Sequence, residues 1–228
     1  MAQINQSRQK PNKNKATYIC LEGKDFIGKS TQTQKLVDYL RESGYKVLQT
    51  KEPGTDHLPI TMELRNFFLN LKYNDQLTPT ARELIAQAIR SIHIEKLINP
   101  IINGENSEGY DFIIQDRGIL SGLAYGVACG NSFEFISDLL DKIITTEGED
   151  SFYDLYDCVI YLRGEAKKGN RTEEFKEGDA MESKGDSFME QVQANMDQFI
   201  KKFSHYRIID VDNKDIDNVF NEVLGIFN

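Results

Sequence analysis

The sequence has no long apolar run and a minority of basic residues, and both absences limit what it can do. No run approaches the ~20 consecutive apolar residues of a membrane-spanning helix, so we expect no membrane span in this chain of 228 residues. Its 27 basic residues are outnumbered by 36 acidic ones, giving a net charge of −9. Because nucleic-acid affinity depends largely on Lys and Arg, this balance argues against a broad nucleic-acid-binding surface. A small anionic ligand needs only a local cationic pocket.

Cysteine and histidine are also scarce, with three residues of each type. Cys20, Cys129 and Cys158 are odd in number and lie among small or apolar residues. This arrangement is typical of reduced thiols and argues against a disulfide framework or a zinc site. The histidines stand apart, without the spacing of metal ligands or of a nucleophile–base pair. We therefore expect a protein of the reducing cytoplasm.

The amino-terminal segment 1–15 differs in composition from the rest of the chain. It carries four basic residues, no acidic residue and almost no apolar side chain, which predicts a disordered tail. It also lacks the apolar core of a secretory signal peptide. Residues 16–228 are expected to fold as one domain, because 39% hydrophobic residues suffice for one buried core.

From Tyr18 onward, short apolar runs alternate with longer helical patterns. This alternation is typical of an α/β protein, in which crossover helices cover a parallel sheet. The pattern predicts five strands, over residues 18–22, 46–50, 111–115, 157–162 and 206–211.

Two longer segments, 29–43 and 80–98, have the apolar periodicity of helices packed on a sheet. In the second segment the stripe expected to face the sheet is Ala81, Leu84, Ile85, Ala88, Ile89 and Ile92. Arg90 then lies on the opposite side, toward solvent or a cleft. The polar segment 164–185 has no such stripe and is predicted to be an exposed, mobile insertion.

The strongest functional signal is a phosphate-binding loop between a predicted strand and a predicted helix. Gly23 to Ser30 read G-K-D-F-I-G-K-S, which matches G-x-x-x-x-G-K-S/T. The glycines let backbone N–H groups turn toward a phosphate, Lys29 neutralises its oxygens, and Ser30 can hold Mg²⁺. The base-reading and switch motifs of GTPases are absent, and the short chain disfavours motor ATPases.

Phosphoryl transfer between two polyanions also requires cations beside this loop. Arg117 follows a predicted strand and can supply one. Asp116 ends the same strand, on the side of the sheet that carries the loop, where its carboxylate can act on Mg²⁺ through water.

Several longer motifs resemble one family. Residues 22–32 read E-G-K-D-F-I-G-K-S-T-Q, where thymidylate kinases have E-G-x-D/E-x-x-G-K-S/T-T-Q. Residues 51–55 read K-E-P-G-T, one glycine shorter than R-E-P-G-G-T, and the family's E-x-I/L-R appears around residues 63–65, which read E-L-R. Residues 116–125 read D-R-G-I-L-S-G-L-A-Y, close to D-R-Y/F-x-x-S-x-x-A-Y. The sequence thus resembles the thymidylate kinase family from Tyr18 to about Phe227.

The resemblance implies a P-loop kinase fold with a mobile lid at about 164–185, which transfers a phosphoryl group from ATP, with Mg²⁺, to dTMP. The ATP-binding residues it implies are Gly23, Gly28, Lys29, Ser30 and Thr31. The acceptor-binding residues it implies are Asp25, Glu52, Arg65, Arg90, Arg117 and Tyr125. The catalytic residues it implies are Lys29, Asp25, Arg117 and Arg171, and the metal-binding residues are Ser30 and Asp116. It also implies a homodimer, with no membrane or nucleic-acid partner.

The residues expected at the nucleobase depart from the family pattern. Arg90 matches the arginine that contacts thymine O4, but Ala86 stands where the family has a stacking aromatic ring, and Gly126 stands where it usually has Gln. Loss of a ring forfeits about 1–3 kcal/mol of stacking. Either a nearby ring, Phe67 or Phe68, replaces it, or the acceptor differs from dTMP. A monophosphate kinase of broadened or altered base choice is therefore an alternative.

Two further departures concern the transferring phosphoryl group. Phe26 stands where some family members have a loop arginine, and the lid motif D-R-x-E is half present, as D-A-M-E with Ala180. Arg171 is the best candidate for the lid arginine, which would close over the site and exclude water. Its competitors are Lys167, Lys168 and Lys176. The same departures leave open a nucleotide-binding regulatory protein that has lost turnover.

Overall fold

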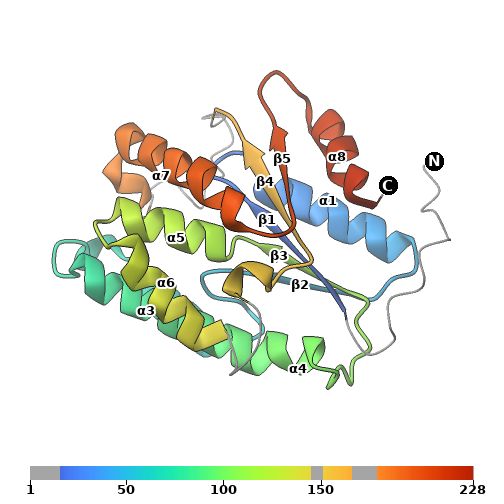
Figure 1. Ribbon diagram of the computed structural model, residues 1–228, viewed down its shortest axis with the longest axis horizontal. Coiled ribbons are helices and arrows are strands. Elements are labelled where there is room, and N and C mark those ends of the chain that lie inside the picture. Colours follow the sequence, from blue (N-terminus) through green and yellow to red (C-terminus); the bar gives the residue numbers. More distant parts are fainter. Residues whose placement is uncertain (1–15, 145–150, 166–178, 228) are drawn as a thin grey trace.

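The computed structural model describes residues 16–144, 151–165 and 179–227 (Figure 1). Within them five strands form one parallel sheet in the order β2-β3-β1-β4-β5. The strands are β1 (Thr17–Glu22), β2 (Val47–Lys51), β3 (Phe112–Asp116), β4 (Cys158–Arg163) and β5 (Tyr206–Asp210). All five predicted strands are confirmed, with ends that differ by at most one residue. The predicted tail, 1–15, lies outside the described residues.

Helices connect the strands and cover both faces of the sheet. They are α1 (Lys29–Glu42), α2 (Pro59–Phe68), α3 (Pro79–His93), α4 (Asn99–Ile102), α5 (Ile119–Ala128), α6 (Phe133–Ile144), α7 (Asp186–Phe199) and α8 (Ile216–Leu224). A π-helical segment, η2 (Ile94–Ile98), continues α3. Short 3-10 turns are η1 (Leu71–Tyr73), η3 (Phe152–Asp154), η5 (Glu182–Lys184), η6 (Ile200–Lys202) and η7 (Gly225–Phe227). No helix of the described ranges is long and apolar enough to cross a membrane.

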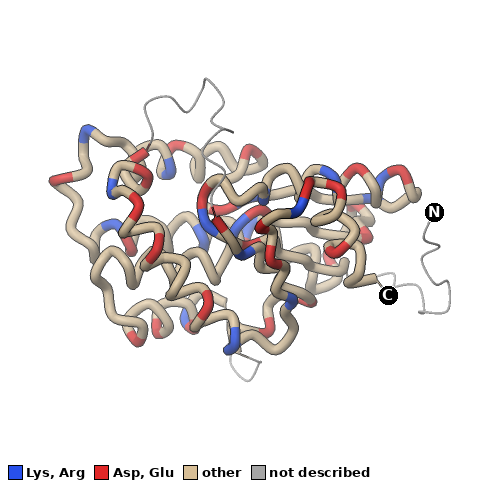
Figure 2. Tube along the Cα trace, turned by 90° about the horizontal axis from the view of Figure 1, so that it is seen from above, with Lys and Arg blue, Asp and Glu red and all other residues tan. Residues whose placement is uncertain are grey.

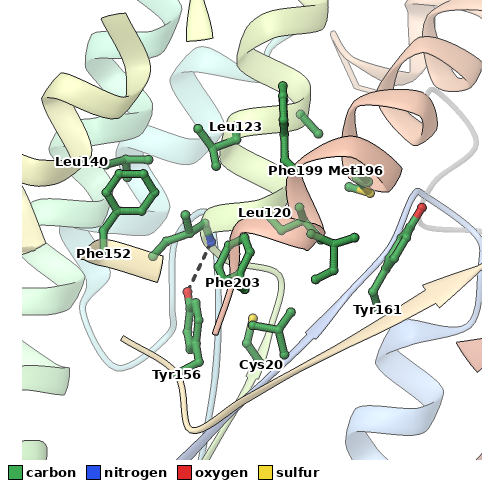
Figure 3. Close-up of a cluster of buried hydrophobic side chains, with 14 of the residues drawn as sticks. Cys20, Leu120, Leu123, Leu140, Phe152, Tyr156, Tyr161, Met196, Phe199 and Phe203 are labelled. Atoms are coloured by element: carbon green, nitrogen blue, oxygen red, sulfur yellow. Dashed lines mark hydrogen bonds between the residues drawn. The ribbon is translucent and has the colours of Figure 1, made fainter. Parts of the chain in front are cut away.

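The sheet is buried on both sides because alternate residues of each strand enter different cores. Ile19 and Leu21 of β1 pack with α1 and α8, whereas Tyr18 and Cys20 pack with the helices of the other face. Figure 3 shows this second core, in which Cys20 lies below side chains of α5 and α7. Apolar runs buried on both faces are typical of strands in parallel sheets. The three cysteines are free thiols, as expected.

Helix α3 buries the opposite face from the one that its apolar periodicity predicts. Its buried residues are Arg82, Glu83, Gln87, Ile89, Arg90 and His93. Leu84 of the predicted stripe is 49% exposed and Ala88 is also exposed. The prediction that this stripe faces the sheet is therefore wrong, apart from Ile89. The physical reason is that an ion pair with Glu52 and a hydrogen bond to Gln87 satisfy the buried Arg90, so that burying this face does not leave its charge unpaired.

The segment 164–185, predicted to be exposed, has two buried residues near its end, before exposed residues 183–185. Ala180 and Met181 are buried, and the backbone N–H of Ala180 donates to the carbonyl oxygen of Leu69 at 3.0 Å. This end of the segment is thus attached to the end of α2, and the prediction of exposure is wrong there. Residues 166–178 lie outside the described part of the chain.

The parallel register brings the loops after three strands to one edge of the sheet. Asp116 of β3 pairs in register with Leu21 of β1 and with Lys51 of β2. Loops at the carboxyl ends of parallel strands are where ligands bind in folds of this kind. Figure 2 shows acidic residues spread over most of the described chain with basic residues interspersed, so the net negative charge does not arise from one segment.

Candidate active site

The loop from Gly23 to Ser30 joins β1 to α1 and has a backbone that only glycine can follow at its first position. Gly23 has φ 145°, and a Cβ there would lie 2.6 Å from the carbonyl oxygen of Leu162. Gly28 caps α1 with a left-handed backbone, φ 96°. The buried ammonium group of Lys29 donates to the carbonyl oxygen of Lys24 at 2.7 Å. The loop therefore presents a helix N-terminus and a held ammonium group, which together suit a phosphate.

Ser30 and Asp116 meet where α1 begins beside the end of β3. The hydroxyl of Ser30 donates to Oδ2 of Asp116 at 2.6 Å. Oδ1 of Asp116 is buried and has no hydrogen-bond partner among the described residues. Buried polar atoms are nearly always paired, and carboxylate and hydroxyl oxygens are ligands that Mg²⁺ accepts, usually with several waters. This donor set fits a magnesium ion at the phosphate loop.

Asp25 joins the loop to α5 through two side chains. Nη2 of Arg117 pairs with Oδ1 of Asp25, and the hydroxyl of Tyr125 donates to Oδ2 at 2.7 Å. Nη1 of Arg117 also donates to the carbonyl oxygen of Gly23 at 3.0 Å. Burial raises the pKa of Asp25, but the positive charges of Arg117 and Lys29 outweigh burial and lower it below its usual value. Asp25 is therefore an ionised acceptor at neutral pH.

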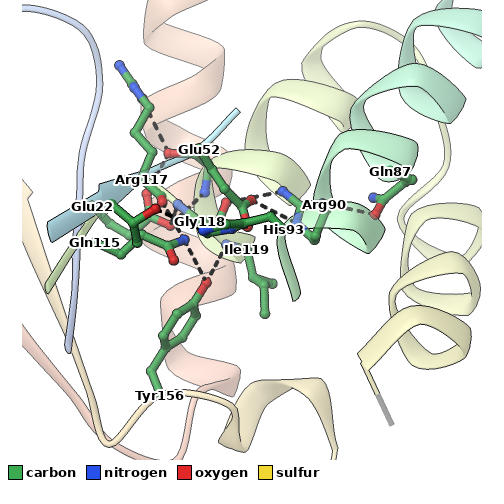
Figure 4. A network of polar contacts seen from close by, with 12 residues as sticks. Glu22, Glu52, Gln87, Arg90, His93, Gln115, Arg117, Gly118, Ile119 and Tyr156 are labelled. Atoms are coloured by element: carbon green, nitrogen blue, oxygen red, sulfur yellow. Dashed lines mark hydrogen bonds and ion pairs between the residues drawn. The ribbon is translucent and has the colours of Figure 1, made fainter. Parts of the chain in front are cut away.

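Glu52, just after β2, joins the sheet to α3 (Figure 4). Nε of Arg90 donates to Oε2 of Glu52 at 2.9 Å, and Nδ1 of His93 lies 3.1 Å from Oε1. Nε2 of His93 is in turn 2.9 Å from Oγ1 of Thr50. Burial raises the pKa of Glu52, but Arg90 and His93 outweigh burial and lower it below its usual value. Glu52 thus fixes the guanidinium of Arg90.

A third carboxylate, Glu22 at the end of β1, holds the start of α5. Its Oε1 accepts from the backbone N–H groups of Gly118, at 2.9 Å, and Ser121, at 3.2 Å, and its Oε2 accepts from the hydroxyl of Ser121. Burial raises the pKa of Glu22. A Cβ at Gly118 would lie 2.2 Å from the hydroxyl oxygen of Tyr156, so this position has no room for a side chain. These contacts set the direction in which Arg117 leaves the sheet.

One pocket opens beside the phosphate loop, between α3 and α5. It brings together all the residues predicted to bind the acceptor: Asp25, Glu52, Arg65, Arg90, Arg117 and Tyr125. Arg65 reaches it from α2, where its Nη1 donates to the carbonyl oxygen of Pro53 at 2.7 Å. Lys29, Ser30 and Thr31 lie beside the pocket in the first turn of α1, where the phosphate-binding motif ends. Arg171, with its lysine competitors, lies outside the described residues.

An aromatic ring does line the pocket, although not from α3. Phe68 of α2 is buried and lines it together with Ala86. Phe67 points elsewhere: it is 43% exposed, and its ring centroid lies 5.0 Å from that of Tyr73. Of the two rings weighed from the sequence, Phe68 is therefore the one in position.

The pocket also contains polar residues that the sequence analysis missed. Glu83 and Arg82 line it from α3, next to Gln87 and beside the family-matched Arg90. Burial raises the pKa of Glu83. The sequence did contain an indication of these pocket residues, because the spacing of residues 83, 86, 87 and 90 places them on one face of a helix. It was outweighed by the apolar stripe on the other side of the helix.

Comparison with known proteins identifies relatives along nearly the whole chain. The family model described as thymidylate kinase matches residues 21–223. The thymidylate kinase of Finegoldia magna is 30% identical over 212 residues, covering 92% of this chain and 96% of that protein. The thymidylate kinase of Mesoplasma florum is 31% identical over 207 residues, covering 90% and 92%.

Solved structures agree in fold. Thymidylate kinase from Ehrlichia chaffeensis superposes with a TM-score of 0.67 at 25% identity, covering 93% of this chain and 98% of that one. Thymidylate kinase from Candida albicans gives a TM-score of 0.65 at 22% identity, covering 93% and 91%. The second likeness concerns the fold alone.

The buried ammonium group of Lys29 leads to a prediction about pH. Burial and the positive charge of Arg117 lower the pKa of Lys29 to about 8, and a bound phosphate would raise it again. At pH values between the pKa of Lys29 in the free protein and its pKa in the complex, Lys29 takes up a proton when ATP binds. The dissociation constant of ATP should therefore increase by up to about tenfold per pH unit above pH 8. Isothermal titration calorimetry over a pH series measures this change.

The control is Lys29→Arg, which keeps a charge that does not titrate in this range. Its dissociation constant should stay nearly level from neutral pH to about pH 9.5. If the dissociation constant of ATP does not change with pH in the wild type, or if it changes equally with pH in the wild type and in Lys29→Arg, Lys29 is not the titrating group.

Proposed function

The chain belongs to the thymidylate kinase family, and from this premise we infer that it transfers the γ-phosphoryl group of ATP to dTMP, giving ADP and dTDP. It is a nucleoside-monophosphate kinase, a transferase, with ATP as the phosphate donor. The observation that supports the inference is the pocket beside the phosphate loop, in which the residues predicted to bind the acceptor converge. No observation favours altered base choice or loss of turnover.

Positioning and charge supply the catalysis that we propose for this site. Lys29 and the N–H groups at the start of α1 bind the transferring phosphates, while Arg117 and Arg65 bind the acceptor phosphate. Arg117 is suited to this role because Asp25 and the carbonyl oxygen of Gly23 hold its guanidinium. Fixed cations favour the transition state without reorganisation. The acceptor phosphate is already ionised, so no strong base is needed.

We propose that Mg²⁺ accompanies ATP and that Ser30 and Asp116 hold it, directly or through water. The unpartnered Oδ1 of Asp116 supports this assignment. When bound, the ion supplies positive charge that neutralises phosphate oxygens. Asp116 itself keeps Ser30 oriented through their hydrogen bond.

For the nucleoside of the acceptor, we propose that Arg90 donates to thymine O4 and that Phe68 supplies the ring that α3 lacks. Asp25, held by Tyr125, would accept from the sugar hydroxyl. Arg171 is proposed as the lid arginine on the strength of the family resemblance. A cytoplasmic location is likewise proposed and rests on the reduced thiols.

We also propose a homodimer in which α2 and α3 face a second copy. Four large apolar side chains of this region are 43–50% exposed: Ile60, Phe67, Leu71 and Leu84. Helices α2 and α3 pack together, so these side chains belong to one region of the surface. Large exposed apolar patches mark interaction sites, and a symmetric pair is the commonest assembly.

Removing the charge of Lys29 tests the kinase mechanism. Lys29→Ala should lower dTMP-dependent ADP release by about 10²- to 10³-fold, because it removes a charge aimed at the transferring phosphates. A coupled ADP-release assay measures turnover, and circular dichroism checks that the fold is intact. Lys35→Ala is the control, because this lysine lies on the same helix and pairs with Asp217 at the surface. Near-wild-type turnover in Lys29→Ala would contradict the mechanism.

A charge in place of Leu84, one of the four exposed apolar side chains of the proposed interface, tests the homodimer. Leu84→Glu should convert the protein to a monomer, because a second copy would bury an unpaired carboxylate against it. Light scattering coupled to gel filtration measures the mass. Ile216→Glu is the control, since this residue is equally exposed but lies on α8. A monomeric wild type, or a dimer that Leu84→Glu does not dissociate, would refute this interface.

A further inference from the structure

Two glycines of α5 make room for two charged side chains of α3. A Cβ at Gly122 would lie 2.5 Å from Nη2 of Arg90, and a Cβ at Gly126 would lie 2.4 Å from Oε2 of Glu83. The glycines are four residues apart and so lie on one face of α5. That face therefore receives the guanidinium of Arg90 and the carboxylate of Glu83, one beside each glycine.

Glu83 is held by a chain of hydrogen bonds that begins at the sheet. Nε of Arg90 donates to Glu52, and Nη1 of Arg90 donates to Oε1 of Gln87 at 3.0 Å. Because its oxygen accepts from Arg90, the Gln87 amide presents its NH₂ group to Glu83, and Nε2 donates to Oε1 of Glu83 at 2.7 Å. Figure 4 shows Arg90 and Gln87 in this order along α3.

The second carboxylate oxygen of Glu83 is left for a ligand. The residue is only 5% exposed and lines the pocket. Its Oε2 makes no hydrogen bond with any described residue, whereas Oε1 accepts from Gln87. Because Oε2 is not enclosed by protein atoms and the side chain lines the pocket, a ligand group in the pocket can donate to it. Between Glu83 and Arg90 on the same face lies Ala86, whose small side chain leaves space above it.

We propose that Glu83 determines acceptor specificity by accepting the N3–H of thymine while Arg90 donates to the adjacent O4. The proposal rests on the proposed function. Thymine presents an acceptor at O4 next to a donor at N3, and Arg90 with Glu83 presents the complementary donor and acceptor. Cytosine presents an amino group and an unprotonated N3 at the same two places, so both contacts would turn repulsive. A site built for such a contact rejects analogues that lack it.

The test compares dTMP with N3-methyl-dTMP, which lacks the N3–H donor. In the wild type, kcat/KM should be about 10- to 100-fold lower for the methylated acceptor, as expected for loss of a hydrogen bond to a charged group. In Glu83→Ala, dTMP should lose a similar factor, and the two acceptors should become nearly equal. Glu95→Ala is the matched control, because Glu95 is an exposed carboxylate on η2 that accepts from Ser91.

Glu83→Gln separates recognition from a merely structural role. It keeps the shape and the hydrogen bond from Gln87, but its own amide NH₂ then faces the N3–H. It should fold like the wild type and still lose about 10- to 100-fold in kcat/KM for dTMP. A structural role predicts instead that Gln restores activity.

The outcomes separate the two proposals. Absence of dTMP-dependent ADP release in the wild type would overturn the proposed function together with this inference. Release with dTMP, but with the same preference over N3-methyl-dTMP in the wild type and Glu83→Ala, would overturn the role of Glu83 alone. A wild type that prefers dCMP to dTMP would also overturn it.

Discussion

The arginines that line the pocket carry like charges that repel one another, and in this protein carboxylates hold them in place. Asp25 pairs with Arg117 beside the phosphate loop, and Glu52 pairs with Arg90 between the sheet and α3. Breaking a fully buried pair such as Glu52–Arg90 by removing one member costs about 3–5 kcal/mol. The carboxylates therefore stabilise the fold and fix the positions of the two guanidinium groups in the pocket.

The same constraint explains why α3 turns its polar face inward. Its contact with the sheet runs through Glu52, Arg90 and His93, so the buried face is a connected polar network in place of an apolar stripe. Leu84 and Ala88 of the helix are left exposed, although Ile89 is buried. In the proposals above, one face of this helix binds the nucleobase of the acceptor, and the other face contacts a second copy of the chain.

The sheet and the phosphate loop could be predicted from the sequence, because each depends on a local pattern. Buried parallel strands require continuous apolar runs, and the loop requires glycines at fixed positions such as Gly23. Which face of α3 is buried could not be predicted from periodicity, because periodicity depends only on the positions of apolar residues along the helix. It contains no information on Glu52, a residue distant in sequence that pairs with the buried Arg90. The packing of Ala180 against Leu69 and the choice of Phe68 over Phe67 likewise depend on contacts between distant segments.

The most direct test of this account is a panel of acceptors with the wild-type enzyme. ADP release would be measured with dTMP, dUMP, dCMP, dGMP and dAMP at matched concentrations of ATP and Mg²⁺. An arginine donor next to a glutamate acceptor predicts that kcat/KM is highest for the bases that pair a carbonyl at position 4 with an N3–H, dTMP and dUMP, and at least about tenfold lower for dCMP. Equal kcat/KM for dTMP and dCMP, or a preference for dCMP, would contradict the assignment of this pocket.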